Sequence, residues 1–372
     1  MKKFLSTLLA FVMMTATFIC VPFKANAETP ASGSLGANIT YTFDSETGVL
    51  TVTGTGATCG HSGSHQFGDN NTEIKKLIIG EGITDIGRYC FSHLTALTEI
   101  EFPSTLQTIG FYFFGYCSSL TELSFPDSVT DLYGSAFGYC PSLQKITIGK
   151  GMKSITGSSF DTTSMLSFSV DPENQYYSAI DGNLYNANGS TLYNYCAGKP
   201  ESEFTVPESV TSIKDYAFSD CVKGKSALTK VVLPTGLKSL GAEAFRSASS
   251  LTEIVLPEGL EKIESGAFKY CSGLENIKLP STLVSVAEYA FEGTNITSLT
   301  LPASLTTANS YSFSRMYQLE ELVVENDNPA LKAVDGVLFS KDGKKLLTYP
   351  AKKTNTSYEI PEGVETVSAT AF

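Results

Sequence analysis

One short stretch of the sequence holds residues that could bind a metal ion. Cys59, His61 and His65 follow each other at intervals of two and four residues, and thiolate and imidazole groups are common ligands of Zn²⁺. The spacing matches no standard zinc site, and the glycines and serines between these residues favour a loop. The sequence therefore predicts no metal and no cofactor, with a zinc site at these three residues as the alternative.

Residues that could act in hydrolysis are few. His93 is the only histidine outside that stretch, and no nucleophile motif such as Gly-x-Ser-x-Gly lies near it. Pairs of carboxylates could hydrolyse glycosides, but the Asp and Glu residues follow repeat positions and turns. The sequence contains no Walker motif or dinucleotide-binding motif. The chain is predicted not to be an enzyme, and a glycan- or peptide-hydrolysing enzyme is the last alternative.

The chain is acidic, which makes some classes of binding partner unfavourable. Its 372 residues include 26 basic and 38 acidic side chains, for a formal net charge of −12. Such a surface repels polyphosphate, so nucleic acid and anionic membranes are unfavourable partners. A hydrophobic fraction of 42% is typical of a globular chain with a core.

The first 27 residues predict a secretory signal peptide. Lys2 and Lys3 precede an apolar stretch over residues 4–21, and Ala25 and Ala27 form an Ala-x-Ala cleavage signature. We expect cleavage after Ala27. No later apolar stretch approaches the roughly 20 residues of a membrane span, so the mature chain is expected to be secreted or held at the cell surface without membrane insertion.

A repeat of 23 residues organises most of the chain. The segment 97–103, Leu-Thr-Glu-Ile-Glu-Phe-Pro, recurs at 120–126 and more loosely at 143–149. A proline or glycine ends each segment, and a phenylalanine follows after eleven residues. These core phenylalanines are Phe91, Phe114, Phe137, Phe160, Phe218, Phe245, Phe268, Phe291, Phe313 and Phe372. A single repeat cannot bury its own apolar side, so the period predicts stacked laps with the rings in one internal column.

Each lap is predicted to contain one short strand and one turn of helix. Apolar residues alternate before the proline, as in Ile100 and Phe102, which is typical of a strand with one buried face. Phe268, Cys271 and Leu274 recur at three-residue spacing, which favours a helical turn. The predicted fold class is an α/β repeat, a solenoid with a parallel β-sheet on one face, short helical turns on the other, and β-hairpin insertions.

The repeated unit resembles the BspA-type leucine-rich repeats of bacterial and some protozoan surface proteins, whose pattern is L-x-x-I-x-L-P-x-x-[VL]-x-x-I-x-x-x-A-F-x-x-C. The resemblance covers residues 74–372. It implies a right-handed, curved leucine-rich-repeat solenoid in an exported protein, often with a role in adhesion or host contact. It implies no particular ligand.

Two segments, residues 168–207 and 322–361, depart from the period and align with each other at an offset of 154. An Asn-Gly pair at 188–189 and an Asp-Gly pair at 342–343 predict a β-hairpin in each. We interpret them as hairpin-bearing laps, and the alternative is that the first one protrudes as a recognition element.

The two ends of the repeat region are expected to differ. Residues 28–73 are predicted to form an N-terminal β-hairpin cap that covers the first strand edge. The solenoid of residues 74–372 stops midway through a lap at Phe372, so we expect it to be incomplete there.

The exposed face of the predicted sheet is the candidate ligand-binding surface. Residues two and four positions before each proline or glycine should form parallel rows on it, with mixed charge. The candidates are Glu99, Glu101, Glu122, Lys145, Lys230, Val232, Glu253 and Val255, with Tyr176 and Tyr177 of the first hairpin-bearing lap. A second candidate is a tyrosine-rich edge, which alternatively only covers the core: Tyr89, Tyr112, Tyr116, Tyr139, Tyr216, Tyr270, Tyr289 and Tyr311.

The cysteines follow the repeat. Cys117, Cys140, Cys221 and Cys271 each come three residues after a core phenylalanine, where a small apolar residue belongs, so we predict buried thiols. Disulfides are the alternative, and Cys117 with Cys140 is the pair best placed to form one.

These observations together favour an exported, non-enzymatic module for recognition or adhesion. Its expected ligand is an extracellular protein or a glycan. A structural stalk or spacer within a larger surface protein is the alternative.

Overall fold

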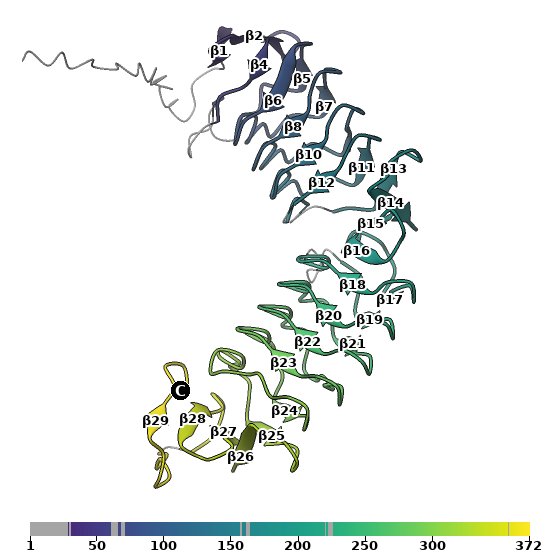
Figure 1. Cartoon of the computed structure of the whole chain (residues 1–372). Helices are drawn as coiled ribbons and strands as arrows, with labels where there is room; N and C mark the ends of the chain where they lie inside the picture. The colour runs from purple at the N-terminus through teal and green to yellow at the C-terminus, as the bar shows by residue number, and fades with distance from the viewer. Residues whose placement is uncertain are drawn as a thin grey trace, which may run out of the picture.

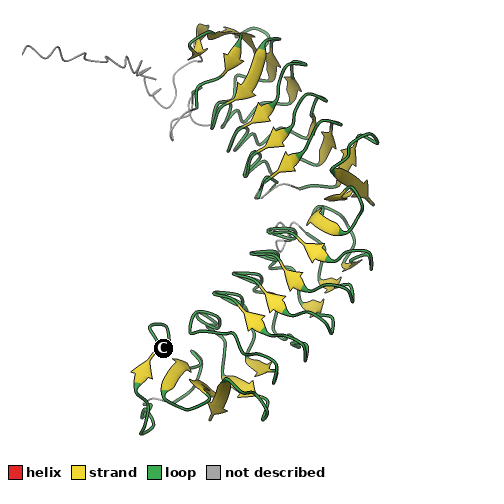
Figure 2. Ribbon diagram, in the orientation of Figure 1, coloured by secondary structure: helices red, strands yellow, loops and turns green. Residues whose placement is uncertain are grey.

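The computed structural model describes residues 29–372 except residues 30, 61–65, 68–70, 157, 161–163, 220, 222–225 and 356. In this described part, the laps stack into an elongated, curved solenoid (Figure 1). Two rows of short strands follow the bend, one nearer its inside and one nearer its outside, and turns join them (Figure 2). We call them the inner row and the outer row.

The outer row consists of the strands that the repeat predicts. They pair in parallel at the repeat spacing, so that Lys76 lies opposite Glu99 and Leu123 opposite Ile146. Leu77 and Ile146 are buried while their neighbours along the strand are more exposed, as the alternation indicates. The strands are β5 (Lys76–Ile79), β7 (Glu99–Glu101), β9 (Glu122–Ser124), β11 (Lys145–Ile148), β13 (Ser167–Val170), β17 (Glu203–Thr205), β19 (Lys230–Val232), β21 (Glu253–Val255), β24 (Ser298–Leu301) and β25 (Glu321–Val324).

The inner row is a second set of parallel strands that the repeat pattern does not reveal. Thr108, Asp131 and Ser154 lie side by side in register. Most of these strands have two residues, which is too short for an alternating pattern to be recognised. They are β6 (Ile83–Ile86), β8 (Thr108–Ile109), β10 (Asp131–Leu132), β12 (Ser154–Ile155), β18 (Ser212–Ile213), β20 (Ser239–Leu240), β22 (Lys262–Ile263) and β23 (Ser285–Val286).

Among the described residues, four strands precede the first regular lap. β1 (Ser32–Gly36), β2 (Ile39–Asp44) and β3 (Val49–Gly54) form an antiparallel meander. β3 then pairs in parallel with β5, which places Leu50 beside Leu77, and β4 (Gly56–Ala57) pairs with β6. The meander therefore joins the outer row, and β1 becomes its edge strand.

The core phenylalanines stack into a column, as the period predicts. The ring centroids of Phe245, Phe268 and Phe291 lie 5.4 and 5.6 Å apart, with interplanar angles of 17° and 8°. All three side chains are buried. In the first hairpin-bearing lap, Tyr195 takes the place of a phenylalanine and stacks on Phe218 at 5.3 Å.

Phe372 does not share this environment. Its side chain is 72% exposed, although the sequence places it at a core position. The ring stacks on Tyr349 at 5.2 Å.

The predicted helical turns are wrong, since the described residues contain no helix. Each lap makes tight turns instead, in which, for example, the Cys271 N–H donates to the Phe268 carbonyl at 3.1 Å. Tyr270 lies between them with φ of 61°, and a left-handed residue cannot continue an α-helix. The Phe268 N–H donates to the Ala290 carbonyl of the next lap at 2.8 Å. Hydrogen bonding at the column therefore also runs between laps.

Each hairpin-bearing lap contains a three-stranded antiparallel meander. In both meanders, an Asp-Gly turn with positive φ at both residues joins the first two strands, as in type I′ hairpins. The predicted turns at Gly189 and Gly343 join the second and third strands. The third strand of the first meander pairs with β18 and so re-enters the inner row. The strands are β14 (Tyr177–Ile180), β15 (Asn183–Asn186), β16 (Thr191–Asn194), β26 (Leu331–Val334), β27 (Val337–Ser340) and β28 (Lys345–Thr348), and β28 pairs with β29 (Thr366–Val367).

Candidate ligand-binding surfaces

The acidic candidates of the first laps lie on the exposed face of the outer row. Glu99 and Glu101 share a cation, because Lys76 Nζ lies 2.7 Å from Glu99 Oε1 and 2.5 Å from Glu101 Oε1. The contacts with Glu101 and Glu99 raise the pKa of Lys76. Glu122 lies opposite Lys145 on the neighbouring strand. Much of the charge on this face is therefore balanced within the protein.

Four other candidates form one patch on β19 and β21. Lys230 lies opposite Glu253 and Val232 opposite Val255. Lys230 Nζ is 3.1 Å from Glu253 Oε1, which raises the pKa of Lys230. Val255 is among the exposed hydrophobic residues. Glu99 with Glu101, Glu122 with Lys145, and the β19–β21 patch belong to three different sheets.

The two tyrosines of the first hairpin-bearing lap face different environments. Tyr176 is 47% exposed, whereas Tyr177 is 4% exposed. The Tyr177 hydroxyl accepts a hydrogen bond from the Ile155 N–H at 2.9 Å, and its ring meets Tyr193 edge-on at 5.1 Å. Burial raises the pKa of Tyr177. Tyr177 belongs to the core, so the structure removes it from the candidate surface.

The candidate zinc ligands are described only in part. His61 and His65 lie outside the described residues. Cys59 is half-buried, and its N–H donates to the Leu35 carbonyl at 2.6 Å. Within the described ranges, no group of three His, Cys, Asp or Glu residues could hold a metal ion.

Three of the cysteines lie buried beside the phenylalanine column, as predicted. The thiols of Cys117, Cys140 and Cys271 each donate to the carbonyl of the phenylalanine 26 residues earlier, at 3.4, 3.0 and 2.9 Å. Burial raises the pKa of Cys140 to about 12. The thiolate that would react or bind metal is therefore scarce at neutral pH. Cys221 is buried at the same repeat position.

The tyrosine edge forms stacks that run along the solenoid. The rings of Tyr89 and Tyr112 lie 5.1 Å apart, and those of His93, Tyr116 and Tyr139 follow at 4.3 and 4.6 Å. All five residues have φ between 50° and 65°, a region that non-glycine residues rarely adopt. Tyr116 and Tyr139 remain 39% and 51% exposed. Ring stacking therefore accompanies an unusual backbone at an open surface.

A second aromatic pair lies where the inner-row strands end. Phe111 and Tyr133 stack at 5.7 Å and are among the exposed hydrophobic residues. The guanidinium of Arg88 lies 5.9 Å from the Phe111 ring centroid and 5.4 Å from that of Tyr89. The sequence analysis missed this pair. The sequence does distinguish these two positions. Phe111 and Tyr133 stand eight and seven residues after a proline, where other laps mostly carry small or polar residues.

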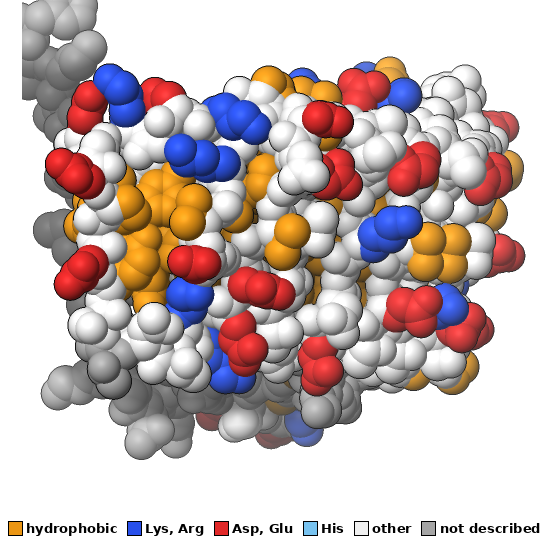
Figure 3. Space-filling model, turned by 90° about the horizontal axis from the view of Figure 1, so that it is seen from below, with side chains coloured by type: hydrophobic (Ala, Val, Ile, Leu, Met, Phe, Trp, Pro, Cys, Tyr) orange, Lys and Arg blue, Asp and Glu red, His pale blue; other side chains and the backbone are white. Residues whose placement is uncertain are grey.

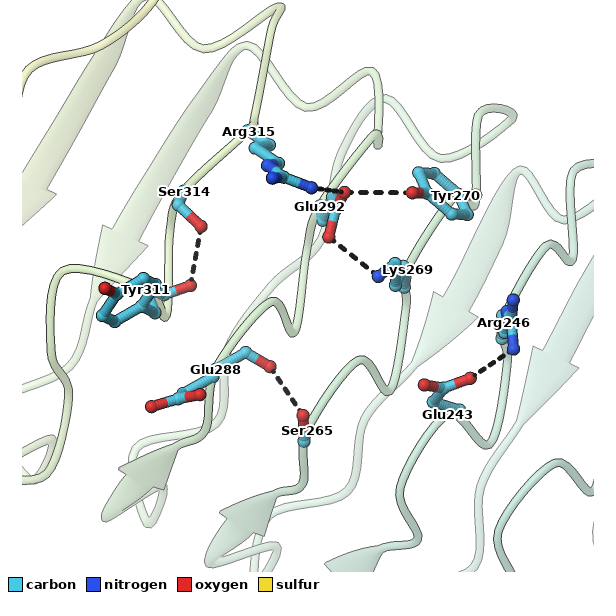
Figure 4. Close-up of polar contacts among 10 residues, drawn as sticks. All are labelled: Glu243, Arg246, Ser265, Lys269, Tyr270, Glu288, Glu292, Tyr311, Ser314 and Arg315. Atoms are coloured by element: carbon cyan, nitrogen blue, oxygen red, sulfur yellow. Dashed lines mark hydrogen bonds and ion pairs between the residues drawn. The ribbon is translucent and has the colours of Figure 1, made fainter. Parts of the chain in front are cut away.

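A buried carboxylate connects three laps at the turn edge (Figure 4). Glu292 is 2% exposed, and its Oε1 accepts hydrogen bonds from the Tyr270 hydroxyl at 3.0 Å and from Arg315 at 3.1 Å. Its Oε2 lies 3.0 Å from Lys269 Nζ. Desolvation acts to raise the pKa of Glu292, but the contacts with Lys269, Arg315 and Tyr270 outweigh it and the pKa is lowered. We call these four residues the Glu292 clamp.

The surface elsewhere is mixed in character. On the face seen from below, acidic and basic side chains alternate around an apolar patch (Figure 3). In the part of the chain that the structure describes, no helix is long and apolar enough to cross a membrane.

Comparison with known proteins places this geometry among bacterial repeat proteins. Residues 63–184, 189–320 and 238–359 match the family described as BspA type leucine rich repeat region, in six copies. The pneumococcal vaccine antigen PcpA has a similar structure over 92% of this chain and 95% of its own, with a TM-score of 0.61 and 20% identity. A leucine rich cell surface protein from Faecalibacterium prausnitzii is similar over 80% of this chain and 96% of its own, with a TM-score of 0.53 and 19% identity. At these identities the likeness concerns the fold alone. No curated protein matches the chain.

Proposed function

The chain belongs to the BspA-type leucine-rich repeat family, and from this premise we propose that it is a non-enzymatic recognition or adhesion module. It is exported or displayed at the cell surface, and it binds an extracellular protein or a glycan. The repeat offers a long, rigid surface rather than a single catalytic cleft, which suits binding.

The exposed aromatic stacks are the observation that carries this proposal. Phe111, Tyr133, Tyr116 and Tyr139 are 39% to 51% exposed, while the phenylalanine column already fills the core. Stacked rings in fixed positions lose little conformational freedom on binding and contribute large contact areas. Aromatic residues are enriched at the centres of protein interfaces for this reason.

A binding assay with matched variants tests the proposal. Purified residues 28–372 are titrated against immobilised extracellular matrix proteins and a glycan array. We expect saturable binding that weakens by about tenfold or more in the double variant Tyr133→Ala/Tyr139→Ala. Tyr317→Ala is the control, because Tyr317 is also exposed but lies outside both aromatic stacks. Absence of saturable binding to every probe would refute the recognition role.

The patch on β19 and β21 is tested in the same assay. Exchange of its charges by Lys230→Glu with Glu253→Lys keeps the ion pair and reverses the pattern that a ligand meets. We expect this exchange to weaken binding as well. Unchanged binding would remove the patch from the recognition surface.

A stalk or spacer is the second candidate function. The ion pairs of Lys76 with Glu99 and Glu101 satisfy charges that a ligand would otherwise use, and the stacked laps form an elongated body suited to a spacer. A spacer tolerates surface substitutions, so adhesion of whole cells that survives both the aromatic and the charge variants would favour it.

Export is proposed from residues 1–27, which lie outside the described residues. Mass spectrometry of the protein from culture supernatant or cell envelope should find a mature chain that begins at Glu28. A chain retained in the cytoplasm with residues 1–27 intact would contradict export.

A further inference from the structure

A cavity opens where the inner row is interrupted. One inner-row sheet ends at β12, and the next begins with the meander of the first hairpin-bearing lap and continues through β16 to β18. The space between them has a volume of about 270 Å³. We call it the junction cavity, and its walls include Thr156, Ser158 and Phe160 on one side and Tyr193, Asn194 and Asp215 on the other.

The floor of the junction cavity is apolar and fixed. Phe160 and Leu184 are buried core residues that line it. The Tyr193 ring is held edge-on against Tyr177 at 5.1 Å, and Lys214 Nζ lies 5.6 Å from its centroid. These contacts hold the aromatic wall in place without a ligand.

The rim of the cavity carries hydrogen-bonding groups in fixed positions. Asn194 ends β16, opposite Leu184 on β15. The carboxylate of Asp215 is anchored, because its Oδ1 accepts the Ala242 N–H at 2.8 Å. A Cβ at position 241 would lie only 2.7 Å from that oxygen and equally close to the Asp215 N and the Ile213 carbonyl oxygen, so the close packing of the two laps requires glycine there. Asn194 and Asp215 both line the cavity, and the carboxylate of Asp215 is held on a rigid support.

The composition of the lining points to one class of ligand. Lys214 and Asp215 balance each other in charge, so the site does not favour an ion. An amide, a carboxylate and hydroxyl groups offer both donors and acceptors beside an apolar floor. A sugar ring has the matching pattern, with C–H groups on its faces and hydroxyls around its edge. The volume lies below the roughly 300–1,000 Å³ of pockets for drug-sized ligands, which fits one ring.

We propose that the junction cavity binds one neutral hexose residue of a glycan. In this arrangement Asp215 and Asn194 bind ring hydroxyls, and Phe160 and Leu184 contact the C–H face. The inference deepens the proposed recognition role and rests on it.

The second hairpin-bearing lap provides an internal comparison. At the offset of 154 it keeps Leu338 at the position of Leu184, but it has Leu347, Thr348, Ser368 and Ala369 at the positions of Tyr193, Asn194, Lys214 and Asp215. The scaffold of the lap thus does not require the polar rim. The rim residues of the first lap are accordingly available for binding.

The test uses NMR titration of the full mature chain with methyl glycosides of glucose, galactose, mannose and N-acetylglucosamine. One small ring gives a dissociation constant of roughly 1 mM, which saturation-transfer measurements detect. We expect saturable binding of at least one glycoside. It should weaken by about tenfold or more in Asp215→Asn, which keeps an oxygen for the Ala242 N–H, and in Asn194→Thr, which installs the residue of the second lap.

Glu288→Gln is the matched control, because Glu288 occupies the repeat position of Asp215 in a later lap and does not line the cavity. Urea denaturation of each variant verifies that the fold is kept. Absence of saturation with every glycoside, or equal binding in all variants, overturns the inference. Binding of only anionic sugars such as glucuronic acid overturns the neutral class.

The outcome is separable from that of the recognition role. If the aromatic variants abolish binding to extracellular probes and no glycoside binds, recognition stands and the junction cavity is not its site. If a glycoside binds the cavity but no extracellular probe binds the chain, the cavity inference stands and the recognition role fails.

Discussion

Replacement of Glu292 by glutamine should destabilise the second half of the solenoid. Glutamine has nearly the same shape and can still accept the hydrogen bonds of Tyr270 and Arg315. It carries no negative charge, so Lys269 Nζ, which lies 3.0 Å from Glu292 Oε2 in the wild type, loses its ionic partner. The change therefore removes the ionic part of the Glu292 clamp and leaves its packing in place.

The size of the effect follows from the burial of the partners. Hydrogen bonds to charged groups contribute about 1.5–3 kcal/mol each to stability. Lys269 is 22% exposed and Glu292 2%, so this contact is little screened, whereas that of Arg315 is at the surface and is left out of the sum. With the weakened bond to Tyr270 included, we expect a loss of about 2–3 kcal/mol in the free energy of unfolding.

The loss should depend on pH. The pKa of Glu292 is lowered in the folded state, so its ionic contribution is present above the unfolded pKa of about 4.3 and disappears as pH falls through the lower, folded pKa. The difference between wild type and Glu292→Gln should be constant above about pH 5.5. It should shrink below about pH 4, where the wild-type carboxyl also becomes neutral.

Urea denaturation followed by tyrosine fluorescence measures both effects, because the chain contains no tryptophan. Glu243→Gln is the control, since Glu243 pairs with Arg246 at 2.8 Å within one lap and both side chains are more exposed. Its loss should stay below about 0.5 kcal/mol. Equal shifts in the two variants, or a Glu292→Gln effect that persists unchanged at pH 3, would refute the clamp.

Three further results are expected. Phe268→Ala should cost about 3–5 kcal/mol in urea denaturation, whereas Phe372→Ala should cost less than about 1 kcal/mol because its ring is exposed; equal losses would contradict the column. Cys140, with its pKa raised to about 12, should react with a maleimide only when the chain unfolds, and rapid labelling of the native protein would contradict its burial. Tyr139→Val should be about 1–2 kcal/mol less stable than Tyr139→Gly, because φ is 63°, and equal stability of the two would show that the backbone there carries no strain.

The sequence predicts the core better than the turns. The phenylalanine column is legible because ring, size and spacing recur together every 23 residues. The three-residue spacing of Phe268, Cys271 and Leu274 fits a chain of tight turns as well as it fits a helix. The deciding feature is the positive φ of Tyr270, and tyrosine is not a residue that signals such a backbone. The spacing therefore predicts a helix where the laps make turns.

The charged rows of the outer face follow from the register alone, so Lys230 and Glu253 could be paired from the sequence. The Glu292 clamp could not. Its three partners come from neighbouring laps, at repeat positions whose residue type varies from lap to lap. Their attraction becomes visible only when the laps are stacked at their actual spacing.

A regular lap supplies both an aromatic ring to the column and a strand to the inner row. The first hairpin-bearing lap supplies the ring but changes the strand. Tyr195 stacks on Phe218 at 5.3 Å, so the aromatic column resumes in this lap. At the same time β16 replaces a regular strand in the inner row and leaves the junction cavity beside β12. A perfectly regular repeat would present the same shallow surface at every lap, with no site distinct from its neighbours. Selectivity in this solenoid is therefore expected where the period is broken, because only there does the surface differ from that of the regular laps.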